Sequence, residues 1–217
     1  MSLFTIVLDL LFPPKCIFCG KILEQSGRLM CPDCQRDLPW LQGRGAEIRV
    51  EFTSLCVSPL RYRTPVRESI HRFKFSGRRW YAKSYGVLTG QCAQDHLEGK
   101  YDLITWVPVS PRRRRERGYD QGQLLAEETA RYLGRQALPT LKKVRDNPAQ
   151  SGIEDDARRR ANVLGAYALL PGAEVEGKRV LLVDDVVTTG ETLAECARML
   201  AMGGASDVLC LTLAKAR

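Results

Sequence analysis

Two adjacent acidic residues stand between an apolar run and a threonine-rich turn, in the stretch VLLVDDVVTTGET at residues 180–192. Burying two carboxylates is costly unless cations or hydroxyl donors surround them, so Asp184 and Asp185 favour sugar hydroxyls or a coordinated metal ion. The turn offers backbone N–H groups, hydroxyls and a helix N-terminus, which suit a phosphate. Ribose 5-phosphate would fit both features, with its hydroxyls on the acidic pair and its phosphate in the turn. The alternative is a strand, turn and helix without a ligand, in which Glu191 only favours the helix N-terminus.

Four of the eight cysteines form two C-x2-C pairs, Cys16 with Cys19 and Cys31 with Cys34, separated by eleven residues. Two such pairs complete the four-coordinate shell of a structural zinc ion and leave no position for water. A segment this short buries little core, so the metal would supply folding free energy. Four unrelated thiols or a redox pair are the alternatives. The other cysteines are expected in the core: Cys56, Cys92, Cys196 and Cys210.

The charge of the chain is unevenly distributed. The formal net charge is +8, yet residues 172–217 carry seven acids and five bases, so residues 1–171 hold +10. Arginine clusters at 112–117 (RRRRER) and 158–160 (RRR) suit nucleic acid or a polyphosphorylated metabolite. Solvated surface arginine is the alternative. The apolar fraction of 44% excludes disorder, and no apolar run reaches the about 20 residues of a membrane span.

Strand and helix patterns alternate in the larger part of the chain. Residues 101–109, 180–183 and 208–213 form apolar runs typical of buried strands, whereas 121–135 and the residues from Gly190 to Gly203 have helical spacing. This alternation predicts an α/β fold with a parallel sheet, whose ligands bind at the carboxyl ends of the strands.

The sequence divides at LQGRGAE, residues 41–47, which is predicted to be a linker. We therefore expect an N-terminal helix and zinc module at 1–42 and a second domain at 48–217. The first dozen residues have helical spacing but lack the basic region and cleavage site of a signal peptide. A cytoplasmic location is therefore expected.

The stretch at 180–192 resembles the phosphoribosyl pyrophosphate (PRPP) loop of type I phosphoribosyltransferases, in which two acids precede T-T-G-x-T. Four further stretches extend the resemblance to the ComF competence family, which joins a four-cysteine zinc module to a phosphoribosyltransferase domain. They are FPPKCIFCG (12–20), HRFKFSGR (71–78), VPVSPRRRRERGYDQGQLLA (107–126) and NPAQSGIEDDARRRANVLGAY (147–167). The resemblance implies the type I phosphoribosyltransferase fold, a parallel sheet flanked by helices, with a small zinc-ribbon-like module.

The resemblance also implies roles for individual residues. The loop at 110–118 would receive pyrophosphate, and residues 145–162 would form a flexible loop that closes over the substrate. Catalytic roles fall on Asp184, Asp185 and Arg117. PRPP or phosphate binding falls on Val186, Val187, Thr188, Thr189, Gly190, Glu191, Thr192, Lys74, Arg112, Arg113 and Gly118. Gln150, Arg159 and Asn162 match the flexible-loop pattern, and Cys16, Cys19, Cys31 and Cys34 are the metal ligands.

The expected function is binding of PRPP with Mg²⁺ and transfer of the phosphoribosyl group to an unidentified acceptor, or hydrolysis of PRPP, in the context of DNA uptake. Two alternatives use the same fold without turnover. One is a competence protein associated with single-stranded DNA, and the other is a PRPP sensor. Expected partners are therefore PRPP, single-stranded DNA and proteins of the competence machinery. The oligomeric state cannot be read from the sequence; a homodimer is one option, because dimers are frequent among phosphoribosyltransferases.

Overall fold

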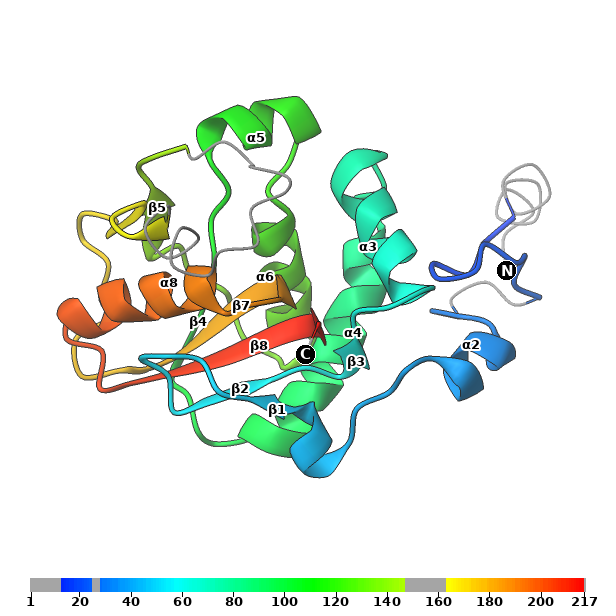
Figure 1. The fold of residues 1–217 in the computed structure, drawn as a ribbon, viewed down its shortest axis with the longest axis horizontal. Helices are drawn as coiled ribbons and strands as arrows, with labels where there is room; N and C mark the ends of the chain where they lie inside the picture. Colours follow the sequence, from blue (N-terminus) through cyan, green and yellow to red (C-terminus); the bar gives the residue numbers. More distant parts are fainter. Residues whose placement is uncertain (1–12, 25–27, 147–162, 217) are drawn as a thin grey trace.

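Strands and helices alternate along most of the chain, and the computed structural model describes residues 13–24, 28–146 and 163–216 (Figure 1). The helix expected within residues 1–12 and the loop residues Gln150, Arg159 and Asn162 lie outside these ranges. No helix within them is long and apolar enough to cross a membrane. In chain order the elements are α2 (Pro32–Asp37), a 3-10 helix (Gly43–Ala46), β1 (Glu47–Ile48), β2 (Leu55–Val57), β3 (Leu60–Arg61), α3 (Val66–Phe75), α4 (Tyr81–Leu97), β4 (Leu103–Trp106), α5 (Pro111–Arg117), α6 (Gln121–Tyr132), β5 (Leu141–Lys143), β6 (Tyr167–Leu169), β7 (Arg179–Val187), α8 (Glu191–Met202) and β8 (Asp207–Lys215).

A six-stranded sheet forms the centre of the molecule, with the order β1-β2-β8-β7-β4 and with β3 paired to the end of β8. In the described part of the chain its pairings are parallel except that of β1 with β2. The long strands β7 and β8 stay in register from Arg179 opposite Asp207 to Val187 opposite Lys215. The predicted parallel α/β sheet is therefore confirmed.

Strand β7 runs beyond the residues predicted for it. The apolar pattern predicts a strand at 180–183, but β7 continues through Asp184 and Asp185 to Val187. The physical reason is backbone pairing, because β8 extends to Lys215 and offers hydrogen-bond partners past the apolar run. The two acids consequently lie within the sheet and not in the turn that follows it.

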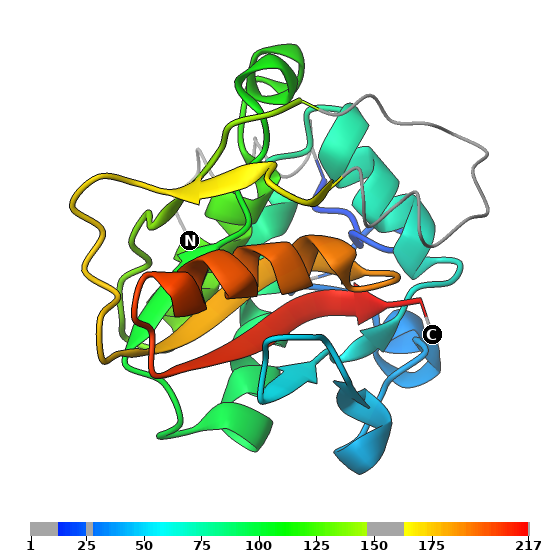
Figure 2. The same cartoon turned by 60° about the vertical axis from the view of Figure 1, so that its left-hand side comes forward.

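Helices cover both faces of the sheet. Figure 2 shows α8 across the near face, and α4 and α6 cover the other. Side chains alternate along β7, so Leu181 and Val183 join the core with α4 and α6, whereas Val180 and Leu182 join the core with α8. Helices α4 and α6 approach closely at Gly86, where a Cβ atom would lie only 2.4 Å from the Glu128 side chain.

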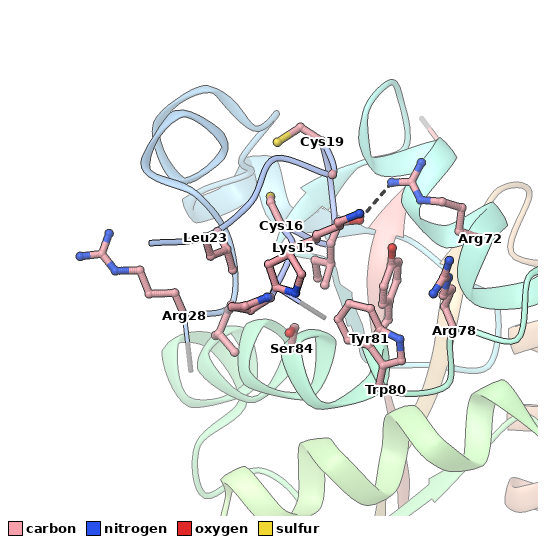
Figure 3. Close-up of a pocket in the computed structure, with 15 residues that line it drawn as sticks. Lys15, Cys16, Cys19, Leu23, Arg28, Arg72, Arg78, Trp80, Tyr81 and Ser84 are labelled. Atoms are coloured by element: carbon pink, nitrogen blue, oxygen red, sulfur yellow. Dashed lines mark hydrogen bonds between the residues drawn. The ribbon is translucent and has the colours of Figure 1, made fainter. Parts of the chain in front are cut away.

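The cysteine-rich segment packs directly on α3. The carbonyl of Ile17 accepts hydrogen bonds from the Ser69 hydroxyl at 2.5 Å and from the Arg72 guanidinium at 3.1 Å. Arg72 also donates to the carbonyl of Phe18 at 2.7 Å, and Figure 3 shows it reaching across to this segment. Ile17 and Phe18 are buried in the same hydrophobic cluster as Phe73 of α3. One core therefore spans the cysteine-rich segment and the larger domain.

The segment at 41–47, predicted as a linker, contains regular structure. It forms the 3-10 helix Gly43–Ala46 and then enters β1 at the edge of the sheet. Ala46 is fully buried, and its carbonyl accepts a hydrogen bond from the N–H of Ser58 at 3.0 Å. These contacts attach the segment to the larger domain.

Candidate functional site

A cavity of about 280 Å³ lies at the carboxyl ends of β4 and β7, where the sequence predicted the ligand site. Residues from α3, α5, α6, β5, β6, β7 and α8 meet around it, together with residues that follow β3, β4 and β7, so stretches far apart in the chain line one space. It is lined by Tyr62, Lys74, Val107, Pro108, Val109, Arg113, Gln121, Lys143, Tyr167, Asp184, Asp185, Val186, Thr188 and Thr192.

The two carboxylates of β7 have different partners. Asp185 is 3% exposed, and its Oδ1 forms an ion pair with the Lys74 ammonium at 2.6 Å. Its Oδ2 is buried and has no hydrogen-bond partner within the described residues. The N–H of Asp185 donates to Oδ1 of Asp184 at 2.8 Å. A buried carboxylate oxygen without a donor is costly, so this atom is suited to a hydroxyl or a cation supplied by a ligand.

Burial and the neighbouring charge of Asp185 raise the pKa of Asp184 to about 8, while Lys74 acts in the opposite direction. Lys74 loses hydration through burial, but the carboxylate of Asp185 outweighs this effect and raises the pKa of the ammonium. Lys74 is therefore charged at neutral pH. At neutral pH Asp184 is therefore mostly protonated, and the two carboxyl groups together carry less than two negative charges. A bound cation or hydrogen-bond donor would allow both to be ionised.

The stretch at 110–118, expected to be a loop, is the helix α5, which corrects that expectation. Ser110 caps the helix by accepting a hydrogen bond from the N–H of Arg113 at 3.3 Å, and Pro111 occupies its first turn. Gly118 ends the helix in the left-handed conformation, with φ of 77°. A serine cap, an early proline and a terminal glycine are ordinary helix signals, so the local sequence explains the difference.

The helical geometry of α5 separates its arginines into two sets. Arg113 lines the cavity, and Arg117, four residues later, is likewise half-buried. Arg112 points to solvent, where it pairs with Glu116 at 2.8 Å. Arg114 and Arg115 are also exposed. Of the arginines expected to bind phosphate, the structure therefore places Arg113 at the cavity and Arg112 away from it.

Arg117 lies beside the cavity and not in its wall. It donates to Oε1 of Gln121 at 2.6 Å, and its guanidinium stands 4.8 Å from the centre of the Phe75 ring. Burial lowers the pKa of Arg117, and the carboxylate of Asp185 works against that shift. The side chain is thus held between α3 and α6, within electrostatic range of Asp185.

The turn after β7 is set by Gly190, which has φ of 88° and sits directly before α8. A Cβ at this position would lie 3.3 Å from Val50, so both conformation and space favour glycine. Thr188 and Thr192 face the cavity, together with Val186 of β7. Thr189 and Gly190 form the rest of the turn, Glu191 is the first residue of α8, and Val187 is buried in the core with α8.

Seven cavity residues received no site role from the sequence reasoning: Tyr62, Val107, Pro108, Val109, Gln121, Lys143 and Tyr167. Lys143 lies on β5, which pairs with β6, and its ammonium is 5.1 Å from the centre of the Tyr167 ring. Burial and the positive charge of Arg113 lower the pKa of Lys143. Side chains alternate along β5, with Leu141 buried and Lys142 exposed. This alternation is the signal from which the inward orientation of Lys143 could have been predicted.

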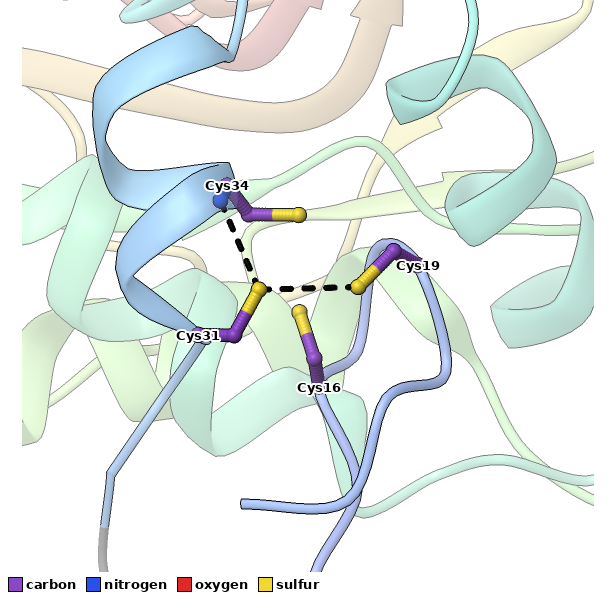
Figure 4. Close-up of side chains that lie close together, drawn as sticks. All are labelled: Cys16, Cys19, Cys31 and Cys34. Atoms are coloured by element: carbon purple, nitrogen blue, oxygen red, sulfur yellow. Dashed lines mark hydrogen bonds between the residues drawn. The ribbon is translucent and has the colours of Figure 1, made fainter. Parts of the chain in front are cut away.

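The four cysteines of the two pairs meet at one point (Figure 4), with their sulfur atoms within 4.8 Å of one another. Cys31 caps α2, and its sulfur accepts a hydrogen bond from the N–H of Cys34 at 3.4 Å. Burial opposes ionisation of Cys16, but backbone donors outweigh it and lower the pKa of this thiol to about 7. Four sulfurs at this separation fit a tetrahedral zinc ion with Zn–S bonds of about 2.3 Å. Cys56, Cys92, Cys196 and Cys210 are buried, as expected.

Comparison with known proteins identifies two domain families. The family described as phosphoribosyl transferase domain matches residues 120–217, and the double zinc ribbon domain matches residues 7–45. The latter range contains four cysteines, which are sufficient for one four-cysteine site. These matches confirm the expected fold class, a phosphoribosyltransferase domain preceded by a small zinc ribbon.

Relatives of similar length are named for competence or for DNA utilization. Competence protein F of Haemophilus influenzae is 29% identical, over 93% of this chain and 97% of the relative. The DNA utilization protein YhgH of Salmonella typhi is 33% identical, over 91% of this chain and 90% of the relative. Among solved structures, the chain is similar to the allosteric regulatory enzyme of purine biosynthesis, with 26% identity and a TM-score of 0.42, over 61% of this chain and 26% of that chain.

The zinc site gives a direct prediction. The wild-type chain should hold about one Zn²⁺ ion, and Cys34→Ser should lose it, because three thiolates leave the tetrahedral shell open. Elemental analysis of the purified proteins measures the metal content. Cys92→Ser is the matched control, since Cys92 is a buried thiol outside the cluster. Equal zinc contents in the two variants would contradict the assignment.

Proposed function

The chain belongs to the family of competence protein F and the DNA utilization protein YhgH, and on this premise we propose that it binds PRPP with Mg²⁺ and transfers the phosphoribosyl group to an acceptor. One observation carries the proposal. A single cavity contains two carboxylates, a threonine turn at a helix N-terminus and three cations from separate elements. These are the charges that a sugar bearing a phosphate and a pyrophosphate requires. The cations are Lys74, Arg113 and Lys143.

The three parts of PRPP correspond to three parts of the cavity. The 5-phosphate suits Thr188 and Thr192, because the first turn of α8 carries N–H groups without helical partners. The ribose hydroxyls can donate to Asp184 and to the unpaired Oδ2 of Asp185. Pyrophosphate then falls on the side of Arg113 and Lys143, two cations that otherwise repel each other.

The transfer step breaks the bond between C1 of the ribose and the pyrophosphate oxygen, while the acceptor nucleophile forms a new bond to C1. Positive charge develops on the sugar and negative charge on the leaving group. The carboxylates of Asp184 and Asp185 stabilise the first charge. Arg113 and Lys143 stabilise the second, and the acceptor supplies the electron pair. No general base is required from the chain where the acceptor is already nucleophilic.

The donor set fits Mg²⁺, which prefers carboxylate and phosphate oxygens. Asp184 and the unpaired Oδ2 of Asp185 are the protein atoms that would contact it directly or through water. When bound with the substrate, Mg²⁺ would neutralise part of the pyrophosphate charge. Release of the proton that the raised pKa retains on Asp184 would accompany this binding.

The biological setting that we propose is DNA uptake, because the relatives are named for competence and DNA utilization. A PRPP sensor of the same fold would bind the ligand without consuming it. Release of pyrophosphate distinguishes the two, since only the enzyme produces it in the presence of acceptor or water.

Calorimetry with PRPP and Mg²⁺ tests the site. Asp185→Asn should weaken binding by about tenfold or more, because it removes a charge-assisted contact worth about 1.5–3 kcal/mol. Asp95→Asn is the control, since Asp95 is exposed on α4 and accepts a hydrogen bond from Gln91. Absence of binding by the zinc-loaded wild type, or equal binding by both variants, would overturn the proposal.

Lys143 and Lys142 provide a second test on adjacent residues, one facing the cavity and one facing solvent. Lys143→Gln should weaken binding of PRPP and of pyrophosphate by about tenfold or more. Affinity for ribose 5-phosphate should stay unchanged, because this ligand lacks the pyrophosphate. Lys142→Gln should leave all three affinities unchanged. A uniform loss for all three ligands in Lys143→Gln would indicate a structural role.

The pKa of Asp184, raised to about 8 by burial and Asp185, predicts a pH dependence. Binding of PRPP with Mg²⁺ requires the carboxylate, so the proton must leave and affinity should increase with pH. Between about pH 7 and about pH 9 the expected gain is about tenfold. Asp184→Asn should bind more weakly and lose this slope. An affinity that falls over the same interval would refute the assignment.

A further inference from the structure

The C-terminal turn of α3 contacts the zinc-binding hairpin, residues 13–24, at the backbone of its first cysteine pair. The Arg72 guanidinium donates to the carbonyl of Ile17 at 3.1 Å and to that of Phe18 at 2.7 Å. The Ser69 hydroxyl, one turn earlier, also donates to the carbonyl of Ile17, at 2.5 Å. Both carbonyls belong to the two residues between the first two cysteines. A change in the conformation of this C-x2-C turn would therefore move the atoms that Arg72 and Ser69 hold.

Two residues after Arg72, the same turn of α3 reaches the acidic pair of β7. The Lys74 ammonium lies 2.6 Å from Oδ1 of Asp185, and both side chains are largely buried. The attraction between two charges decreases as their separation grows, so a shift of α3 would weaken this ion pair. The position of α3 therefore determines how well Lys74 compensates the buried acids.

The same turn also supports α5, the arginine-rich helix. The carbonyl of Phe73 accepts a hydrogen bond from the Tyr119 hydroxyl, just beyond the end of α5. The Phe75 ring lies 4.8 Å from the Arg117 guanidinium, within the range of a cation–π contact. Four consecutive residues of α3, 72–75, thus contact the zinc-binding hairpin, the acidic pair and α5.

A groove of about 780 Å³ lies beside the hairpin, with Arg72 and Trp80 in its wall (Figure 3). It separates part of the hairpin from the first turn of α4, so the contacts with α3 do more to set the position of the hairpin. The groove shares no lining residue with the cavity that contains Asp185. The two spaces are thus separate, and the contacts of residues 72–75 join them through α3.

We propose that the last turn of α3 couples zinc binding by the four cysteines to PRPP binding in the cavity, with Arg72 as the positioning residue. A bound zinc ion would hold the two cysteine pairs together and fix the turn whose carbonyls Arg72 contacts. Lys74 would then be held against Asp185 before the substrate arrives. This inference rests on the proposed function and adds a means of regulation, because loss of zinc would lower the affinity for PRPP.

Coupling between two binding sites is reciprocal, so PRPP must strengthen zinc binding by the same factor by which zinc strengthens PRPP binding. The test measures the zinc affinity of the full chain by competition with a chromogenic chelator that does not bind Mg²⁺. Saturating PRPP with Mg²⁺ should raise this affinity about fivefold or more over Mg²⁺ alone. Asp185→Asn, measured in parallel, accounts for zinc bound by free PRPP.

The role of Arg72 is tested in the zinc-loaded chain. Arg72→Gln should weaken PRPP binding about fivefold or more and should remove the effect of PRPP on zinc affinity. Arg72→Lys keeps a charged donor and should retain part of both. Arg67→Gln is the matched control, because Arg67 is exposed on the same helix, and both quantities should equal those of the wild type.

The outcomes distinguish this coupling from the proposed function. If the wild type does not bind PRPP in calorimetry, the proposed function is wrong and the coupling falls with it. If PRPP binds but the zinc affinity stays unchanged, only the coupling is overturned. A merely structural Arg72 would lower the melting temperature of Arg72→Gln and leave the effect of PRPP on zinc affinity unchanged, which would overturn its positioning role. If Arg72→Gln does not fold, the comparison of Arg72→Lys with the wild type decides.

Discussion

The ion pair between Asp185 and Lys74 is the central constraint of the candidate site. It joins the carboxyl end of β7 to the end of α3 at 2.6 Å, within a largely buried environment. Taking a carboxylate out of water costs several kcal/mol, and one cation compensates that cost only in part. Oδ2 of Asp185 has no hydrogen-bond partner within the described residues, and the pKa of Asp184 is raised. Both features arise because one cation does not fully compensate two buried carboxyl groups. A ligand that supplies hydroxyl donors and a cation would complete this compensation.

Helix α3 contacts both the zinc-binding hairpin and the acidic pair of β7. Ser69 and Arg72 hold the carbonyls of the zinc-binding hairpin, and Lys74, two residues later, reaches the acidic pair. A zinc ion bound by the four cysteines would therefore also support the helix that positions Lys74 in the candidate cavity. The same helix contributes Arg72 to the groove beside the zinc-binding hairpin and Lys74 to the cavity with the acidic pair.

Much of the candidate site could be predicted because it is local in sequence. Asp184, Asp185 and the turn through Thr192 are consecutive, so strand and turn geometry alone bring them together. The cysteine pairs are nearly as local, since each C-x2-C forms one turn. The orientation of α5 was not predicted, although its cap, its proline and its final glycine are visible in the sequence. Its resemblance to a phosphate loop outweighed these helix signals, and only the helical geometry separates Arg113 from Arg112.

The sequence alone is enough to predict the four-cysteine cluster, the acidic pair followed by a turn suited to phosphate, and the parallel sheet that carries them. Tertiary structure decided which of the candidate cations line the cavity, and it added Lys143. Lys74, Arg113 and Lys143 come from three elements far apart in the chain. The family resemblance indicated Lys74 and Arg113, but nothing in the sequence around Lys143 indicated its role. The groove beside Trp80 exists only because the zinc ribbon folds back onto α3 and α4. The physical reason is that spacing along the chain fixes contacts within one strand, turn or helix, whereas contacts between elements depend on how their buried faces pack.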